Sequence, residues 1–153
     1  MLNSALIVDL DGTLALNEHR QHFVNGKTKD WEAFFNACDR DEPNVKVLEV
    51  IHRLVSSAAS TENPLSVFIL SGRSDLVKDK TLDWLKDYVT FEFKLVMRSA
   101  GDRRPDAELK KQFARELALT PETVLAVIDD RSSVVAMWRK EGFTVLQVAD
   151  NRF

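Results

Sequence analysis

The sequence predicts an α/β fold in which a parallel sheet of about five strands carries helices on both faces. The main observation is that short apolar runs, typical of buried strands, alternate along the chain with runs of helical period. Such alternation is typical of parallel strands joined by helical crossovers. A second observation is the length, because 153 residues are enough for a full core. We therefore expect a single domain over residues 1–153.

The elements follow in chain order. We expect strands at 5–10, 65–70, 94–98, 124–129 and 144–148. We expect helices at about 30–38, 44–59, 75–88, 105–117 and 131–141. In the second of these helices the apolar positions recur with helical period: Val47, Leu48, Ile51, Leu54 and Val55. The segment 14–29 is polar and has no clear period, so we predict no regular element there.

Composition and charge exclude few classes of function. Hydrophobic residues make up 44% of the chain and charged residues 29%, as in an ordinary globular protein. The net charge of −3 gives no general reason to expect nucleic-acid binding, so any such contact needs a local cluster of basic residues. The single cysteine, Cys38, excludes an internal disulfide and is expected as a small core residue. The sequence shows no signal-peptide pattern or membrane span, and we expect a cytoplasmic protein.

The motif Asp9-Leu10-Asp11-Gly12-Thr13 follows the first apolar strand and is the clearest functional signal. It places two carboxylates at the carboxyl end of a buried strand, the edge at which open α/β sheets bind ligands. Because neighbouring carboxylates repel each other, a divalent cation or a proton must compensate. Such a pair offers a nucleophile and a proton carrier for phosphoryl transfer. Taken alone, the motif also fits a simple acidic turn.

Two other predicted strands also end in polar residues that can bind phosphate or a metal ion. Ser71 and Arg73 follow the second strand, where a hydroxyl and a guanidinium can hold phosphate oxygens. The alternative is that Ser71 or Ser74 caps the next helix. Asp129 and Asp130 end the fourth strand, where one of them can complete the oxygen shell of Mg²⁺. Capping by Asp130 is the alternative there, and we favour metal binding for Asp129.

The remaining motifs indicate little on their own. Asp106 and Lys110 lie four residues apart on a predicted helix, a spacing that by itself indicates a surface ion pair. Gly26-Lys27-Thr28 is not a nucleotide-binding loop, because Gln21 stands where its first glycine is needed and no strand precedes it. We therefore expect no kinase activity. The tryptophans fall in predicted helices and are expected in the core or partly buried: Trp31, Trp84 and Trp138.

In their order along the chain, these motifs resemble the four-motif signature of the haloacid dehalogenase superfamily: Asp9-Leu10-Asp11-Gly12-Thr13, Ser71, Lys110 and Asp129-Asp130. A closer resemblance covers nearly the whole chain. Three segments are similar to the 3′-phosphatase domain of phage polynucleotide kinase: Ser71-Gly72-Arg73, Gly101-Asp102-Arg103-Arg104 with Asp106 and Lys110, and Ile128-Asp129-Asp130-Arg131. The kinase half of that protein has no counterpart here. The segment 14–29 matches poorly, and a substrate-binding arginine of the family corresponds there to Arg20 or to Lys27.

The resemblance implies a Rossmann-like, haloacid dehalogenase-like fold with little or no cap, and a two-step reaction that depends on Mg²⁺. Asp9 would attack phosphorus and form an aspartyl-phosphate. Asp11 would protonate the leaving 3′-oxygen and then activate water. The metal would be held by the Asp9 carboxylate, the Asp11 main-chain carbonyl and Asp129, with Asp130 nearby.

The same resemblance implies how the substrate is held. Ser71 and Lys110 would bind the transferring phosphoryl oxygens. Arg73 would contact substrate phosphate, and Asp106 would orient Lys110 or a neighbouring arginine. Further arginines fall near the predicted strand ends and would form a local phosphate-binding patch: Arg98, Arg103, Arg104 and Arg131.

The implied substrates are 3′-phosphates, and also 2′,3′-cyclic phosphates, at the ends of DNA or RNA. The segment between the first two strands is too short for a full cap, and an open site suits the end of a polymer. The alternatives are a small-molecule nucleotidase of the same superfamily and a non-catalytic phospho-acceptor module. The acid/base residue Asp11 argues against the latter, since accepting a phosphoryl group does not require it. A separate kinase or ligase would be the partner in nucleic-acid repair.

Overall fold

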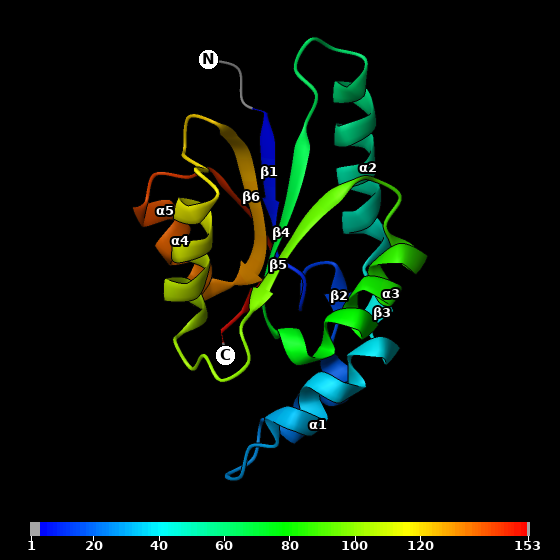
Figure 1. The fold of residues 1–153 in the computed structure, drawn as a ribbon, viewed down its shortest axis with the longest axis vertical. Helices are drawn as coiled ribbons and strands as arrows, with labels where there is room; N and C mark the ends of the chain where they lie inside the picture. Colours follow the sequence, from blue (N-terminus) through cyan, green and yellow to red (C-terminus); the bar gives the residue numbers. More distant parts are fainter. Residues whose placement is uncertain (1–3, 153) are drawn as a thin grey trace.

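The structure is a computed structural model that describes residues 4–152, and its centre is a five-stranded parallel sheet (Figure 1). The strand order is β5-β4-β1-β6-β7, and each neighbouring pair runs parallel. The strands are β1 (Ala5–Val8), β4 (Ser66–Ser74), β5 (Phe93–Arg98), β6 (Val124–Arg131) and β7 (Val145–Asn151). The predicted parallel α/β fold is confirmed.

Helices cover both faces of this sheet. Figure 1 shows α2 (Val45–Ala59) and α3 (Lys78–Tyr88) on one face, and α4 (Asp106–Glu116) and α5 (Ser132–Lys140) on the other. Successive side chains of a strand point to opposite faces, so β1 contributes to two cores. Leu6 and Val8 pack in the core that includes residues of α2 and α3, whereas Ile7 packs in the core that includes residues of α4 and α5.

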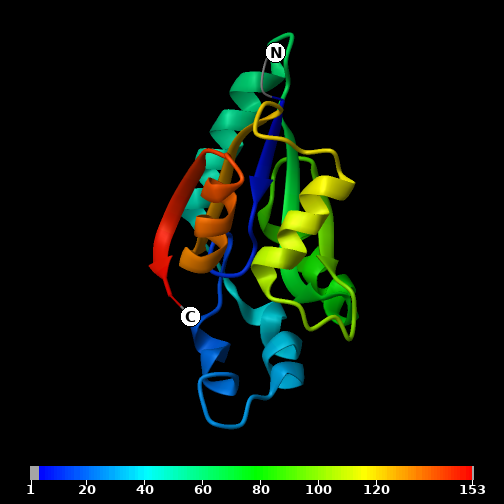
Figure 2. The same cartoon turned by 90° about the vertical axis from the view of Figure 1, so that its left-hand side faces the viewer.

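A small group of short elements lies beyond the carboxyl ends of the strands (Figures 1 and 2). It consists of β2 (Ala15–Leu16), a 3₁₀ helix (Glu18–Phe23), α1 (Trp31–Asn36), a second 3₁₀ helix (Ala37–Arg40) and β3 (Glu42–Pro43), which pairs with β2. The segment expected to be irregular therefore contains a 3₁₀ helix, and the helix expected at 30–38 is shorter. Among the described residues, these short elements are all that lies between β1 and α2 in the chain, which agrees with the prediction of little or no cap domain.

Three strands, β4, β6 and β7, run further than the apolar pattern predicts. Strand β4 continues to Ser74 and β6 continues to Arg131, so both polar motifs lie within the sheet and not after it. The pairing register shifts between Ser71 and Ser74 on β4, and between Asp129 and Arg131 on β6. Irregularities of this kind locally re-aim side chains. Here they fall at the predicted functional residues.

The structure also decides the capping alternatives. The Ser74 hydroxyl accepts a hydrogen bond from the Leu76 amide and caps the 3₁₀ turn Asp75–Val77 that leads into α3. Asp130 does not cap α5, whose N-cap residue is Arg131 and has no side-chain cap. Cys38 is fully buried, as expected for a core residue. Within residues 4–152, no helix is both long enough and apolar enough to cross a membrane.

Candidate active site

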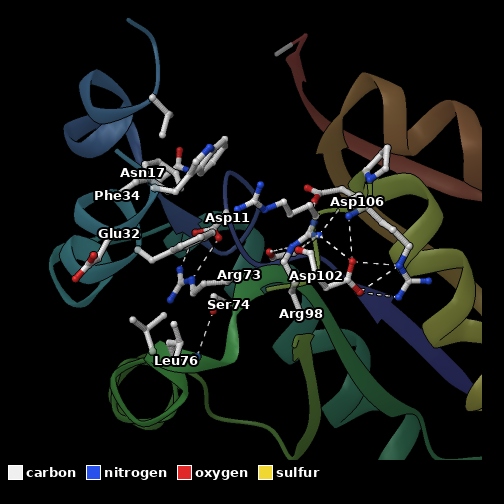
Figure 3. A pocket seen from close by; sticks show the side chains of 18 of the residues that line it. Asp11, Asn17, Glu32, Phe34, Arg73, Ser74, Leu76, Arg98, Asp102 and Asp106 are labelled. Carbon is white, nitrogen blue, oxygen red and sulfur yellow. Dashed lines mark hydrogen bonds and ion pairs between the residues drawn. The ribbon is translucent and has the colours of Figure 1, made fainter. Parts of the chain in front are cut away.

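The carboxyl edge of the sheet opens into a cavity of about 900 Å³ (Figure 3). Its lining includes Asp9 and Asp11 after β1, Arg73 on β4, Lys110 on α4 and Asp130 on β6. The topology explains this convergence, because parallel strands all bring their carboxyl ends to the same edge. The other predicted residues Ser71 and Asp129 are buried within this edge, next to residues that line the cavity.

Three carboxylates meet at the centre of this edge. Asp9, Asp129 and Asp130 are all buried, and each has an oxygen within 4.8 Å of the other two. The Thr13 hydroxyl lies 3.1 Å from Asp9 Oδ2 and 3.0 Å from Asp130 Oδ1, and so bridges two of them. The Asn151 amide donates to Asp130 at 2.5 Å. Buried carboxylates this close need a compensating cation.

Part of that compensation comes from Lys110. Its Nζ lies 2.5 Å from Asp9 Oδ1 and 2.9 Å from Asp129 Oδ2. Burial alone would lower the pKa of Lys110, but Asp129 and Asp9 raise it well above its usual value. Lys110 is therefore a permanent cation of the site, and the alternative of a surface ion pair with Asp106 is wrong.

One ammonium does not balance three carboxylates. Burial raises the pKa of the Asp9 carboxyl well above its ordinary range; Lys110 opposes this rise, whereas Asp129 and Asp130 add to it. A divalent cation would restore the balance. The donor set fits Mg²⁺, since all three side chains offer hard oxygen ligands and the cluster contains no cysteine or histidine. Of the predicted ligand set, the structure thus brings together Asp9, Asp129 and Asp130.

Two glycines permit the close approach of carboxylates at this edge. Gly12 has a φ of +83°, and a Cβ there would lie 2.2 Å from Asp130 Oδ2. A Cβ on Gly72 would lie 2.6 Å from Asp106 Oδ1. Real atoms do not approach so closely, so glycine is required at both positions for the carboxylates to stay where they are.

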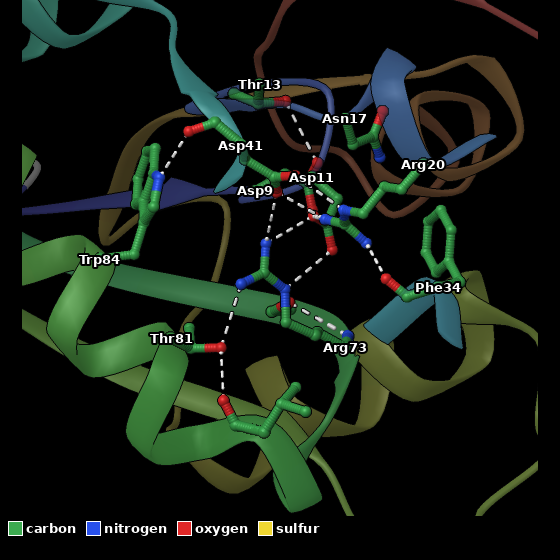
Figure 4. Close-up of polar contacts among 12 residues, drawn as sticks. Asp9, Asp11, Thr13, Asn17, Arg20, Phe34, Asp41, Arg73, Thr81 and Trp84 are labelled. Carbon is green, nitrogen blue, oxygen red and sulfur yellow. Dashed lines mark hydrogen bonds and ion pairs between the residues drawn. The ribbon is translucent and has the colours of Figure 1, made fainter. Parts of the chain in front are cut away.

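The Asp11 side chain points away from the three-carboxylate cluster and toward two arginines (Figure 4). Its Oδ1 accepts hydrogen bonds from Arg73 Nη2 at 2.6 Å and from Arg20 Nη2. Burial alone would raise the pKa of Asp11, but Arg73 and Arg20 together hold it well below its ordinary value. Asp11 is therefore ionised in the free protein and separate from the carboxylates that would bind a metal.

A second buried carboxylate, Asp41, holds the same two arginines (Figure 4). Its oxygens accept from Arg20 Nε at 2.7 Å, from Arg20 Nη2 at 2.6 Å and from Arg73 Nη2 at 3.2 Å. Arg73 also donates to the Thr81 hydroxyl at 3.0 Å. We call the set of Asp11, Arg20, Asp41 and Arg73 the arginine–aspartate network. It contains two guanidiniums and two carboxylates, so its charges balance.

This network bears on two expectations from the sequence. Of the two candidates in the segment 14–29, Arg20 lies in the network and is fully buried, whereas Lys27 is exposed and does not line the cavity. Arg73 lines the cavity, but its guanidinium is buried and occupied by carboxylates, so contact with substrate phosphate remains a prediction. The Ser71 hydroxyl accepts from the Arg73 amide at 3.1 Å, and its role toward phosphate also remains a prediction.

The other arginines form the opposite wall of the cavity. Asp106 accepts from Arg98 and, at 2.7 Å, from Arg131 Nη1, so it orients arginines and not Lys110. Arg98 also donates to the carbonyl oxygens of Gly72, Asp102 and Arg104, which fixes the loop before α4. These contacts give Arg98 a structural role, and its contact with substrate phosphate remains a prediction.

The two exposed arginines of that loop differ in their partners. The Arg104 guanidinium pairs with Asp102 at 2.6 Å, and this pairing lowers the pKa of Asp102 to about 2. Arg103 is exposed and, among residues 4–152, has no carboxylate partner. The charge of Arg103 is therefore available to a ligand, and contact of Arg103, Arg104 or Arg131 with substrate phosphate remains a prediction.

Sequence reasoning missed three residues of the site. Asp41 and Asn151 have no motif around them, and only the fold brings them to Arg20 and to Asp130. Trp31 was expected in the core or partly buried, but it is 48% exposed and lines the cavity. The expectation does hold for Trp84 and Trp138, which are buried.

Comparison with known proteins identifies relatives of the whole chain. Residues 3–153 match the family model described as "Polynucleotide kinase PNKP phosphatase domain". A protein of Autographa californica nuclear polyhedrosis virus, named "Putative bifunctional polynucleotide kinase/RNA ligase", is 32% identical over 136 residues, which is 88% of this chain and 18% of the viral protein. This chain therefore spans a small part of that relative.

Solved structures also resemble this chain over nearly its whole length. A chain in the structure of the Pnkp1/Rnl/Hen1 RNA repair complex superposes with a TM-score of 0.76 and 30% identity, over 99% of this chain and 44% of that one. A haloacid dehalogenase family enzyme of Bacteroides thetaiotaomicron, in complex with magnesium and inorganic phosphate, superposes with a TM-score of 0.54 and 15% identity, over 95% and 93% of the two chains. The latter likeness concerns the fold.

Proposed function

Because the chain belongs to the polynucleotide kinase phosphatase-domain family of haloacid dehalogenase-like phosphatases, we propose that it removes 3′-phosphates from nucleic-acid ends in a Mg²⁺-dependent reaction. The observation that carries the proposal is the separation of two acidic centres. Asp9 lies with Asp129, Asp130 and Lys110, whereas Asp11 lies with two arginines. One strand end thus supplies two carboxylates with different surroundings and different chemistry.

In the first step, an Asp9 carboxylate oxygen attacks phosphorus and the bond to the 3′-oxygen breaks, which leaves an aspartyl-phosphate. Lys110 stabilises the negative charge on the transferring group, because it is a buried and permanent cation beside Asp9. Asp9, Asp129 and Asp130 would hold the metal, which would reduce repulsion between the anionic nucleophile and the anionic substrate.

Asp11 acts as the proton carrier in both steps. It donates a proton to the leaving 3′-oxygen and then removes one from the water that hydrolyses the aspartyl-phosphate. The arginines keep the pKa of Asp11 low in the free protein, so Asp11 takes up the proton that it donates when the substrate binds, and after the first step it is again a carboxylate that can accept one from water. A substrate phosphate beside Asp11 adds negative charge and raises that pKa, which suits the first step.

The shape and charge of the cavity support a polymer end as substrate. The cavity is open over about 900 Å³, and its wall presents the available guanidinium of Arg103. Phosphates upstream of the 3′ end would contact this wall. A separate kinase or ligase would complete end repair, since the viral relative is named for those two activities and this chain spans only part of it. The cytoplasm is the expected location.

A substrate panel with Mg²⁺ tests the proposal. It contains 3′-phosphorylated DNA and RNA oligomers, 2′,3′-cyclic ends, 5′-phosphorylated oligomers and mononucleotides. We expect the highest kcat/KM on 3′-phosphorylated oligomers. Preference for mononucleotides would support the nucleotidase alternative. A stable phosphoprotein with no turnover would support the phospho-acceptor alternative.

A further inference from the structure

Helix α1 carries an exposed tryptophan, Trp31, whose ring packs against two phenylalanine rings. Trp31 is 48% exposed, whereas Phe34 beside it is buried. The Trp31 ring lies edge-on to Phe34 at 5.7 Å and is stacked on Phe35 at 5.9 Å between ring centroids. Phe34 is in turn covered by the Arg20 guanidinium, 4.3 Å from its centroid. The orientation of Trp31 is thus set by neighbours that belong to the site itself.

This aromatic group forms the wall of the cavity opposite the arginines. The same cavity is lined by Asp9, by Trp31 with Phe34 and Phe35, and by Arg103. In Figure 3, Phe34 and Glu32 lie on one side of Asp11, and Asp102 and Asp106 lie on the other. A molecule whose phosphate reaches Asp9 therefore lies between an aromatic wall and a wall that carries the exposed guanidinium of Arg103.

The chemistry of the aromatic wall matches a nucleobase. A base offers a flat apolar face, and its stacking on aromatic side chains is the usual way in which single strands are held without regard to sequence. The Lys29 ammonium lies over the Trp31 ring, 5.7 Å from its centroid, and supplies a positive charge of the kind that backbone phosphates require. An aromatic ring next to a cation is the combination found in single-strand binding sites.

We propose that Trp31 stacks on a nucleobase close to the 3′ end of the substrate strand. This inference rests on the proposed function and makes the single-stranded end of a polynucleotide the recognised substrate. It explains why a large apolar side chain stays exposed at a catalytic edge while Phe34 and Phe35 pack beneath it.

The first test uses substrates without bases. For a 3′-phosphorylated oligomer, Trp31→Ala should raise KM by about 5- to 150-fold, the range expected for loss of one base stack. Abasic residues placed in turn at the last three positions should identify one position where the variant no longer differs from the wild type. Trp31→Phe should keep most of the affinity. Tyr88→Ala is the control, because Tyr88 is also an exposed aromatic residue, at 43%, but lies outside this cavity.

The second test does not depend on turnover. Trp84 and Trp138 are buried, so a base that stacks on Trp31 should quench the fluorescence of the exposed indole. Titration with 3′-hydroxyl oligomers should quench the wild type and leave Trp31→Phe unchanged. Equal KM increases for normal and abasic oligomers, or no quenching, would overturn the proposal. If 3′-phosphatase activity is present but Trp31→Ala has a normal KM, the proposed function stands and the stacking does not.

Discussion

Replacement of Asp41 by asparagine tests whether the arginine–aspartate network stabilises the fold and positions Asp11. The Asp41 side chain is fully buried and accepts bonds of 2.6 and 2.7 Å from Arg20 and of 3.2 Å from Arg73. Asparagine has the same shape but carries no charge, and one of its two polar atoms cannot accept a hydrogen bond. The variant therefore leaves two buried guanidiniums with Asp11 as their one carboxylate partner in the network.

The magnitude follows from this imbalance. Removal of one partner from a buried ion pair typically costs about 3–5 kcal/mol, because the remaining charge stays desolvated. Such a loss is a large part of the stability of a domain, which is about 5–15 kcal/mol. With an m-value of about 2 kcal/mol/M, the urea midpoint of Asp41→Asn should fall by about 2 M. Activity should also fall, since Arg20 and Arg73 would no longer hold Asp11 in one orientation.

The assay is equilibrium urea unfolding followed by far-ultraviolet circular dichroism, with the phosphatase rate measured below the unfolding transition. Asp39→Asn is the matched control, because Asp39 is an exposed aspartate in the 3₁₀ helix that ends immediately before Asp41. Its midpoint should change little, as for surface substitutions within about 0.5 kcal/mol. If Asp41→Asn is as stable as Asp39→Asn, the network contributes nothing net and the reasoning is refuted.

Three further predictions concern the metal and the substrate. Chelation should stop turnover, and added Mg²⁺ should restore it; full activity in excess chelator would remove the metal from the mechanism. Asp129→Ala should weaken the apparent Mg²⁺ affinity more than Asp130→Ala does. Gly12→Ala should lower both the melting temperature and Mg²⁺ affinity, because its Cβ would lie 2.2 Å from Asp130 Oδ2; unchanged values in calorimetry would show that the carboxylate moves freely. Arg103→Gln should raise KM for oligonucleotides, and reduce its salt dependence, while KM for a small aryl phosphate stays the same; equal effects on both would assign Arg103 to the chemistry or the fold.

The apolar pattern of the sequence was sufficient to predict the succession of the five sheet strands and the main helices along the chain, and the sheet edge that carries the site. Asp9 and Asp129 were predictable because each follows a buried apolar run, where an unpaired charge is costly. The spacing around Lys110 indicated only a surface ion pair, and the family resemblance alone pointed to its place in the site. The carboxyl ends of β4 and β6 were not predictable, because their polar residues continue to pair with the neighbouring strand after the apolar run stops.

Residues joined by tertiary contact alone were beyond sequence reasoning. Asp41 meets Arg73 across 32 positions of the chain, and Asn151 meets Asp130 across 21. No local spacing indicates either pair. The exposure of Trp31 was missed for a related reason: helix α1 is only six residues long, too short for its apolar period to show which side chain remains outside the core.

The central claim is that Asp9 carries the phosphoryl group removed from a 3′ end. The direct measurement is an acid quench of a single turnover with Mg²⁺ and an oligomer labelled with ³²P in its 3′-phosphate. The protein is then isolated and digested to locate the label. We expect transient label on Asp9, release of inorganic phosphate as the label decays, and neither in Asp9→Asn. Phosphate release at a normal rate with no labelled protein, or near-normal turnover by folded Asp9→Asn, would contradict it.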